Sequence, residues 1–166
     1  MVSCENVLRM AGLEEVTEQD IVDYAANTEN PYGTKERLCV TDSTPGANGG
    51  TNCLDRQVIL NDFGVSSGIE YQSVDTIAKA VESGRGVIIS VDAGKFYDRP
   101  EYNGGGHAVT VTSVRRGPDG ELQGFYICDS NSGVRGKTGA LYVEAAKLDD
   151  ALDKNNYCNI TTDPIR

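Results

Sequence analysis

"NGGGHAVTVTSVRRGPDGELQGFYICDSNSG", residues 103–133, is the stretch that decides the fold predicted for this chain. Two runs of alternating apolar and polar residues flank a short turn, a pattern typical of an antiparallel hairpin. Pro118 and Asp119 occupy the tip and Gly120 follows them, which is the composition of a type I turn closed by a left-handed glycine. The stretch also holds His107, the only histidine of the chain, at the start of its first strand.

The register of this hairpin predicts an acid beside His107. If Arg115 pairs with Glu121, the numbers of paired residues sum to 236, and His107 faces Asp129. Facing side chains have Cβ atoms about 5 Å apart, so a carboxylate can accept a hydrogen bond from the imidazole and fix its tautomer. A slip of the register at the glycine of the turn would bring one of the next two residues to the ring instead. Asn131 is therefore the second choice for the orienting residue.

Three glycines precede His107 and leave an open approach to its ring. This favours a functional site at the rim of the sheet. Two other interpretations stay open, namely a flexible glycine loop and a surface histidine that happens to begin a strand.

Length and composition exclude several classes of protein. The 166 residues suit one domain, which we expect to span residues 1–166. The formal net charge of -10 disfavours binding to nucleic acid and to anionic membranes, and no export signal or membrane span is evident. Five cysteines without a CxxC pair, together with one histidine, predict neither a metal site nor a disulfide framework, and we expect no cofactor.

The remaining segments predict helices followed by strands. Four segments show apolar residues at helical spacing after a residue that can cap a helix, namely 3–12, 17–27, 51–64 and 73–84. The predicted caps are Ser3, Thr17, Thr51 and Ser73. We expect a capping box at Asp20 and inward positions at Leu54, Val58 and Phe63. Residues 27–50 are expected to form a long loop. Strands are predicted near 86–94 and 156–162, and a strand leading into a helix over 140–153, which gives an α+β class with a mainly antiparallel sheet.

At this level the chain resembles a known family. "GGGHAVTVTSV", a glycine-containing turn and "GFYICDSNSG" resemble the histidine and aspartate strands of papain-like cysteine peptidases of the bacteriocin-processing type. "VSCENVLRMAG" is similar to their first helix, and "GGTNCLDRQVILNDFGV" to a stretch that follows a Gly-Gly-Thr. The whole pattern, including the ending "NITTDPIR", is most similar to papain-like toxin domains at the C-termini of long bacterial secreted proteins. The resemblance implies a papain-like fold with a cleft between the first helix and the His107 strand, and a catalytic role for His107 and Asp129.

The family's nucleophile has no counterpart in this chain. The resemblance implies a Cys-Gly pair at the N-cap of the first helix, about nine residues before the Leu-Arg pair that matches Leu8 and Arg9, and an oxyanion-hole Gln a few residues earlier. This places the nucleophile just before Met1. We therefore expect a domain that starts just after the nucleophile or has lost it, with impaired activity.

Cys4 is the alternative nucleophile. If Ser3 caps the helix, Cys4 lies in the first turn, where the helix dipole and free N–H groups lower the pKa of a thiol. However, five positions separate Cys4 from the family site, which is a rotation of about 140° around the helix, so a packing role is the favoured interpretation. The other four cysteines match no motif and are expected to be buried or incidental thiols.

Three functions follow from these observations. The first is a papain-like cysteine peptidase, or a related thiol acyl-transferase or amide hydrolase, that acts on a peptide or protein. The second is a catalytically dead papain-like domain that binds a peptide or a protein, and the third is an acidic interaction domain. Partners implied by the resemblance are a protein substrate and a cognate inhibitor or immunity protein. We expect a soluble bacterial protein that is made in the cytoplasm and delivered as part of a larger secreted protein.

Overall fold

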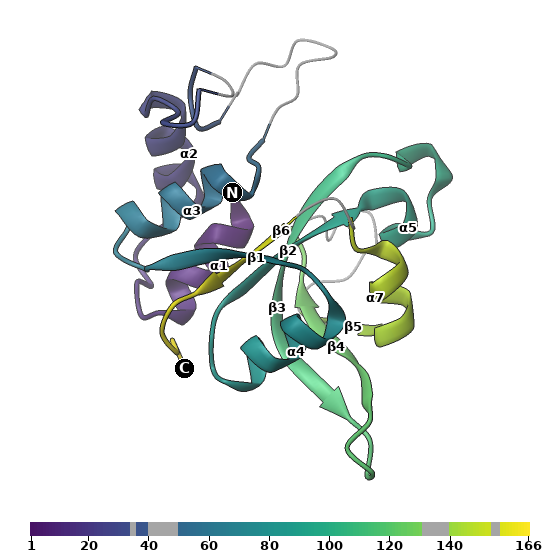
Figure 1. The fold of residues 1–166 in the computed structure, drawn as a ribbon. Helices are drawn as coiled ribbons and strands as arrows, with labels where there is room; N and C mark the ends of the chain where they lie inside the picture. Colours follow the sequence, from purple (N-terminus) through teal and green to yellow (C-terminus); the bar gives the residue numbers. More distant parts are fainter. Residues whose placement is uncertain (34–35, 40–49, 131–139, 154–156) are drawn as a thin grey trace.

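A sheet of antiparallel strands forms the centre of the computed structural model of residues 1–166 (Figure 1). The structure describes all residues except 34–35, 40–49, 131–139 and 154–156. Six strands in this described part follow the order β1-β6-β2-β3-β4-β5, and all neighbours are antiparallel. Their bounds are β1 Ser67–Tyr71, β2 Val87–Asp92, β3 Gly106–Arg116, β4 Leu122–Cys128, β5 Leu141–Glu144 and β6 Tyr157–Thr161. The predicted α+β class is confirmed.

Helices cover both faces of the sheet (Figure 1). On one face, Ile88 of β2 packs in an apolar cluster with residues of the first three helices. On the other face, the alternate residues Val87, Ile89 and Val91 pack in a second cluster with residues of the later helices. The helices are α1 Val2–Met10, α2 Glu18–Asn27, α3 Cys53–Asp62, α4 Val74–Glu82, α5 Ala93–Tyr97, the 3-10 helix η1 Pro100–Tyr102 and α7 Ala145–Ala151. None of these described helices combines the length and apolar content that a membrane crossing requires.

Of the four predicted helix caps, two are confirmed and two are wrong. The Thr17 hydroxyl accepts from the backbone N–H of Asp20, whose carboxylate closes the capping box, and Ser73 caps α4. Helix α1 starts earlier than expected, at Val2, and Ser3 is not its cap. The Ser3 hydroxyl instead donates to the backbone of β3, because the first turn of α1 lies directly against this strand.

Helix α3 buries a different face from the one predicted. Leu54, Val58 and Phe63 are only half-buried. The buried residues of α3 are instead Cys53, Asp55, Arg56, Ile59 and Leu60, and two of these side chains are charged. Hydrogen bonds make this burial possible, since the Arg56 guanidinium donates to side chains of the sheet. The cap is also one residue later than predicted, at Asn52, with Asp55 closing a capping box.

The β3–β4 hairpin forms as predicted but in another register. Gly120 has a φ of 84° and its N–H donates to the carbonyl of Gly117, so the turn has the expected type. Arg115 pairs with Gly124, not with Glu121, because the ladder starts at the turn with Arg116 opposite Leu122, two positions from the predicted register, and a bulge then adds one more. Thr112 on β3 and Gln123 on β4 each lack a partner in the ladder, and the numbers of paired residues sum to 238 at both ends and 239 between the bulges.

Several short elements were not predicted. Strand β1, helix α5 and the 3-10 helix η1 all lie in segments without a clear apolar period. Half of the expected loop over residues 27–50 lies outside the described residues, and its described part holds an isolated bridge between Glu29 and Arg37.

Candidate active site

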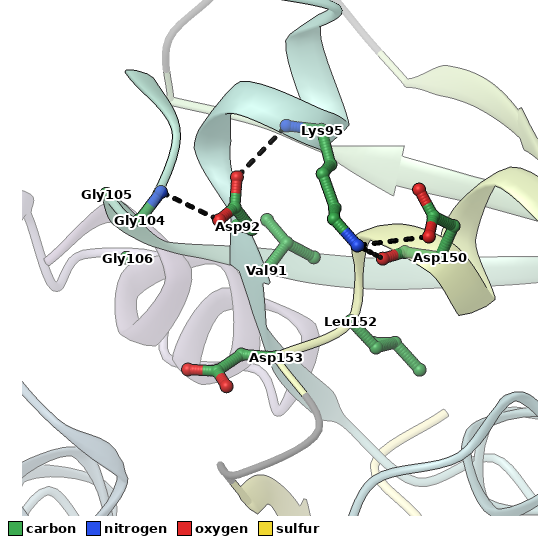
Figure 2. Close-up of a pocket in the computed structure, with 9 residues that line it drawn as sticks. All are labelled: Val91, Asp92, Lys95, Gly104, Gly105, Gly106, Asp150, Leu152 and Asp153. Carbon is green, nitrogen blue, oxygen red and sulfur yellow. Dashed lines mark hydrogen bonds and ion pairs between the residues drawn. The ribbon is translucent and has the colours of Figure 1, made fainter. Parts of the chain in front are cut away.

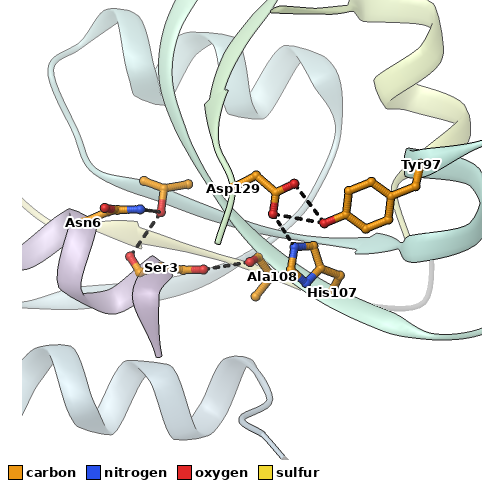
Figure 3. Close-up of polar contacts among 7 residues, drawn as sticks. Ser3, Asn6, Tyr97, His107, Ala108 and Asp129 are labelled. Atoms are coloured by element: carbon orange, nitrogen blue, oxygen red, sulfur yellow. Dashed lines mark hydrogen bonds and ion pairs between the residues drawn. The ribbon is translucent and has the colours of Figure 1, made fainter. Parts of the chain in front are cut away.

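His107 and Asp129 form a hydrogen-bonded pair at one end of the sheet. His107 is the second residue of β3 and Asp129 directly follows β4. His107 Nε2 lies 2.8 Å from Asp129 Oδ1 (Figure 3), so the predicted proximity is confirmed. The imidazole is 19% exposed and the carboxylate 6% exposed, which leaves the ring accessible and its partner protected.

The geometry of the pair defines the basic nitrogen of the ring. An ionised carboxylate only accepts hydrogen bonds, so Nε2 of His107 carries the proton that it donates to Asp129. In the neutral imidazole Nδ1 is then the nitrogen with the free lone pair. Such a ring can take up a proton at Nδ1 while the carboxylate stabilises the resulting positive charge.

The pair forms although the predicted register was wrong by two residues. Continuing the register of Thr110 with Cys128 places Asp129 opposite Val109, not opposite His107. His107 and Asp129 are then diagonal neighbours on one face, because side chains two residues apart on a strand point to the same side. Asn131, the second choice of orienting residue, lies outside the described residues.

Tyr97 is a third member of this site that sequence reasoning missed. Its hydroxyl donates to Asp129, with distances of 2.8 Å to Oδ2 and 3.0 Å to Oδ1. Its ring also contacts the imidazole of His107, with centroids 5.6 Å apart. Tyr97 ends the five-residue helix α5, which has no periodic pattern from which a helix, or the direction of its side chains, can be predicted.

The first turn of α1 lies against the strand that carries His107. The Ser3 hydroxyl donates to the carbonyl of Ala108 at 2.8 Å, and the Thr110 hydroxyl donates to the carbonyl of Ser3 at 3.2 Å. Asn6 adds a longer contact to Thr110 (Figure 3). The start of α1 and the start of β3 are therefore held in direct contact.

The thiol of Cys4 is fully buried in the cluster beneath α1, and burial raises its pKa to about 11. Cys39, Cys53 and Cys158 are also buried. Cys128 is half-buried and pairs with Thr110, on the face of the sheet opposite to that of Asp129. The hydrogen bonds and ring contacts of His107 within the described residues involve Asp129 and Tyr97 and no cysteine.

A pocket of about 340 Å³ opens beside the imidazole. Its lining comes from the segment between β2 and β3 and from the start of β3, namely Ala93, Tyr97, Glu101, Tyr102, Asn103, Gly105, Gly106 and His107. This pocket is not the cleft that was expected between α1 and the His107 strand. At that place hydrogen bonds hold the first turn of α1 directly against β3. In the part of the chain that the structure describes, no group of three or more His, Cys, Asp or Glu side chains is arranged to hold a metal ion.

Comparisons with known proteins show the family and the fold of this chain. The model of the Peptidase_C39 like family matches residues 1–150. A search of curated proteins finds no match. Among solved structures, the crystal structure of a candidate C39-like peptidase from Bacillus anthracis has a TM-score of 0.67 and 16% sequence identity, covering 96% of this chain and 86% of the other. The two chains thus share a fold, and the family match over most of the sequence shows that this chain belongs to the Peptidase_C39-like family.

Proposed function

We propose that this chain is the papain-like domain of a thiol-dependent peptidase, or of a related acyl-transferase or amide hydrolase, in which His107 is the general base and Asp129 orients it. The 2.8 Å contact between His107 Nε2 and Asp129 Oδ1 carries the proposal. It leaves Nδ1 free to take a proton from a thiol. The start of α1, where the family's nucleophile is expected, is tied to the residue that follows His107.

The reaction follows from these positions. A thiol at the N-terminal end of α1 passes its proton to Nδ1 of His107, and the thiolate attacks the carbonyl carbon of the scissile amide. The imidazolium then protonates the leaving amine, and water hydrolyses the thioester with His107 again acting as base. Asp129 stabilises the imidazolium throughout, because its carboxylate accepts the Nε2 proton.

In this proposal the segment that leads into α1 supplies the thiol, and Cys4 does not. The Cys4 side chain is fully buried and burial raises its pKa to about 11, so almost none of it is thiolate at neutral pH. Without a thiolate at the family position the His–Asp pair has no covalent route to an acyl intermediate. We therefore expect little or no peptidase turnover from residues 1–166 alone.

The substrate class and the setting complete the proposal. We propose a peptide or protein substrate, and a toxin-type effector role within a larger bacterial secreted protein that is paired with a cognate inhibitor or immunity protein. The similarity of the sequence pattern to papain-like toxin domains supports this setting. The net charge of -10 disfavours nucleic acid, anionic membranes and acidic substrates as partners.

A binding module is the second candidate function. The burial of four of the five thiols, and the position of Cys128 on the other face of the sheet, favour it for residues 1–166 as they stand. In that case the pocket beside His107 would hold a peptide without cleaving it.

Residue-resolved alkylation tests the proposal. A form extended by a Gln-containing stretch and a Cys-Gly pair directly before Met1 is treated briefly with iodoacetamide at neutral pH and analysed by mass spectrometry. We expect the added thiol to react rapidly, His107→Ala to slow it by about tenfold or more, and Cys4 to stay slow. A Ser-Gly extension serves as the control and should show no peptidase turnover.

Two results would contradict this assignment. An added thiol that reacts no faster than it does in the His107→Ala form would remove the catalytic role of the pair and leave the binding module. Rapid alkylation of Cys4 in the unextended chain, abolished by His107→Ala, would make Cys4 the nucleophile of a working enzyme.

A further inference from the structure

We infer that Tyr97 is a positioning residue that holds the Asp129 carboxylate, and through it the imidazole of His107, in the orientation needed for proton transfer. The catalytic meaning of this inference rests on the proposed function of His107 and Asp129. The contact itself belongs to the resting protein and can be tested without any turnover.

Asp129 accepts hydrogen bonds from two different parts of the chain, β3 and α5, among its contacts. His107 donates to Oδ1, whereas the Tyr97 hydroxyl lies 2.8 Å from Oδ2 and 3.0 Å from Oδ1 and shares its one proton between them (Figure 3). Donors on both sides restrict rotation of the carboxylate about its last bond. Because the Asp129 side chain is only 6% exposed, these bonds replace water as the groups that stabilise its negative charge.

The sheet alone does not fix Asp129. The ladder between β4 and β3 ends at Cys128, and the ladder between β4 and β5 ends at Ile127. Asp129 is therefore the first residue beyond both ladders. A hydrogen bond from another element, that of Tyr97, therefore contributes to the direction in which its carboxylate points.

Segment 93–105, which carries Tyr97, is anchored at both ends. The N–H of Ala93 donates to the carbonyl of Gly105 at 2.7 Å. The Asp92 carboxylate accepts from the backbone N–H groups of Lys95 and Gly104 (Figure 2). These bonds connect the start of α5 to the end of the segment, and so restrict movement of the helix that carries Tyr97 relative to β2 and β3.

The same strand pair that anchors segment 93–105 also carries His107. Asp92 of β2 pairs with Gly106 of β3, and Val91 pairs with His107. Tyr97 and His107 therefore extend from one rigid frame. The Tyr97 ring, only 8% exposed, packs edge-on against Phe96 and at a tilt of 45° against the imidazole, which shields the carboxylate from water.

The imidazole N–H proton reports directly on this arrangement, because His107 is the only histidine. We propose to measure the exchange rate of the Nε2 proton with water by ¹H–¹⁵N NMR, at a pH where the ring is neutral. Tyr97→Phe keeps the ring and removes only the hydroxyl, and we expect it to accelerate exchange by about tenfold. Tyr32→Phe is the matched control, since Tyr32 is 46% exposed and does not line this pocket, and it should leave the rate unchanged.

A double-mutant comparison separates positioning from a general effect on packing. If Tyr97 acts through Asp129, Tyr97→Phe has no further effect on exchange once Asp129→Ala is present. An equal acceleration in both backgrounds, or no acceleration in the parent, overturns the inference. Should Tyr97→Phe fail to fold, the hydroxyl proton of Tyr97 in the parent replaces it as a probe. This proton should exchange slowly and become fast in Asp129→Ala, and equally fast exchange in both overturns the inference.

The alkylation experiment distinguishes this inference from the proposed function. In the form extended by Cys-Gly, both His107→Ala and Tyr97→Phe should slow the added thiol, and Tyr32→Phe should not. If His107→Ala slows the thiol and Tyr97→Phe does not, the proposed function stands and the positioning role of Tyr97 fails. If His107→Ala has no effect, the proposed function fails, while the exchange measurement still decides whether Tyr97 holds Asp129 and His107 in place.

Discussion

The Ser3 hydroxyl donates a 2.8 Å hydrogen bond to the carbonyl of Ala108, the residue that directly follows His107. This bond crosses from the first turn of α1 to the start of β3, over 105 positions of the sequence. It fixes the helix end at which the family's nucleophile is expected relative to the candidate base. A change that loosens this contact therefore affects both the stability of the domain and the geometry of the site.

Replacing Ser3 with Ala removes this contact and should lower the free energy of unfolding by about 1 kcal/mol, because the half-buried carbonyl of Ala108 loses a donor. Urea unfolding at neutral pH measures the change. Ser66→Ala is the control, since Ser66 is exposed and its hydroxyl bonds Thr162 at the surface. Equal losses in the two variants would show that the Ser3 bond contributes nothing specific.

Arg56 should be a major determinant of stability. Its guanidinium is buried and donates to Asn159 Oδ1 at 2.9 Å, to Ser90 Oγ at 3.0 Å and to the carbonyl of Thr51 at 3.0 Å. Burial lowers the pKa of Arg56, and these acceptors compensate the cost of burying its charge. Arg56→Met leaves buried acceptors without a donor and should cost about 3 kcal/mol in urea unfolding.

The control for Arg56→Met is Arg9→Met. The Arg9 guanidinium is exposed and pairs with Glu5 one turn earlier on α1, so its removal should change the free energy of unfolding by less than about 0.5 kcal/mol. A small loss for Arg56→Met as well would mean that the buried hydrogen bonds contribute no more than an apolar side chain of similar size.

Alkaline pH should destabilise the domain through Cys4. Burial raises the pKa of the Cys4 thiol from 9.0 to about 11, so between these values the unfolded chain releases a proton that the folded chain keeps. The stabilisation from this group is complete below pH 9 and is lost as the pH rises to 11, with a slope of up to about 1.4 kcal/mol per pH unit.

Cys4→Ala tests this by reducing the slope of unfolding free energy against pH between pH 9 and 11. Val7→Ala is the matched control, because Val7 is fully buried in the same helix and cluster but does not titrate. Parallel slopes for the parent and for Cys4→Ala would show that Cys4 is not the source of the alkaline destabilisation.

Gly94 should tolerate no side chain. A Cβ at this position would lie 2.1 Å from Asn103 Oδ1 and 2.6 Å from its backbone nitrogen, so segment 93–105 would have to shift. We expect Gly94→Ala to lower stability by about 1–3 kcal/mol and to accelerate exchange of the His107 Nε2 proton, because Tyr97 moves with the segment. A Cβ at Gly68 meets nothing within 4 Å, so Gly68→Ala is the control and should not affect this exchange.

The sequence predicted the His107–Asp129 pair because alternation along a strand survives an error in register. The predicted pairing was wrong by two residues at the site, and a shift of two keeps both side chains on the same face. The bulges at Thr112 and Gln123 could not be predicted, since neither position differs in residue type from a regular strand. They let Val114 and Leu122 pack on the same core as Val111 and Ile127 despite the change in alternation.

Other features depend on contacts between distant residues, which a local pattern does not reveal. Helix α5 has only five residues, and it is held by the Asp92 cap and by close packing of Gly94 on Asn103. The buried face of α3 includes Arg56 because acceptors from β2 and β6 reach it. Sequence periodicity assigns such charged residues to the surface, so the buried face of α3 was predicted wrongly. The role of Tyr97 was missed because α5 is too short to show a period.

The two bulges of the hairpin also limit how this domain can change length during evolution. Thr112 and Gln123 lie on opposite strands, and the numbers of paired residues have the same sum before the first bulge and after the second. Loss of one bulge residue alone would turn the apolar side chains of half a strand toward water, whereas loss of both would restore a regular ladder with His107 and Asp129 still on one face. Relatives should therefore retain or lack this pair of residues together.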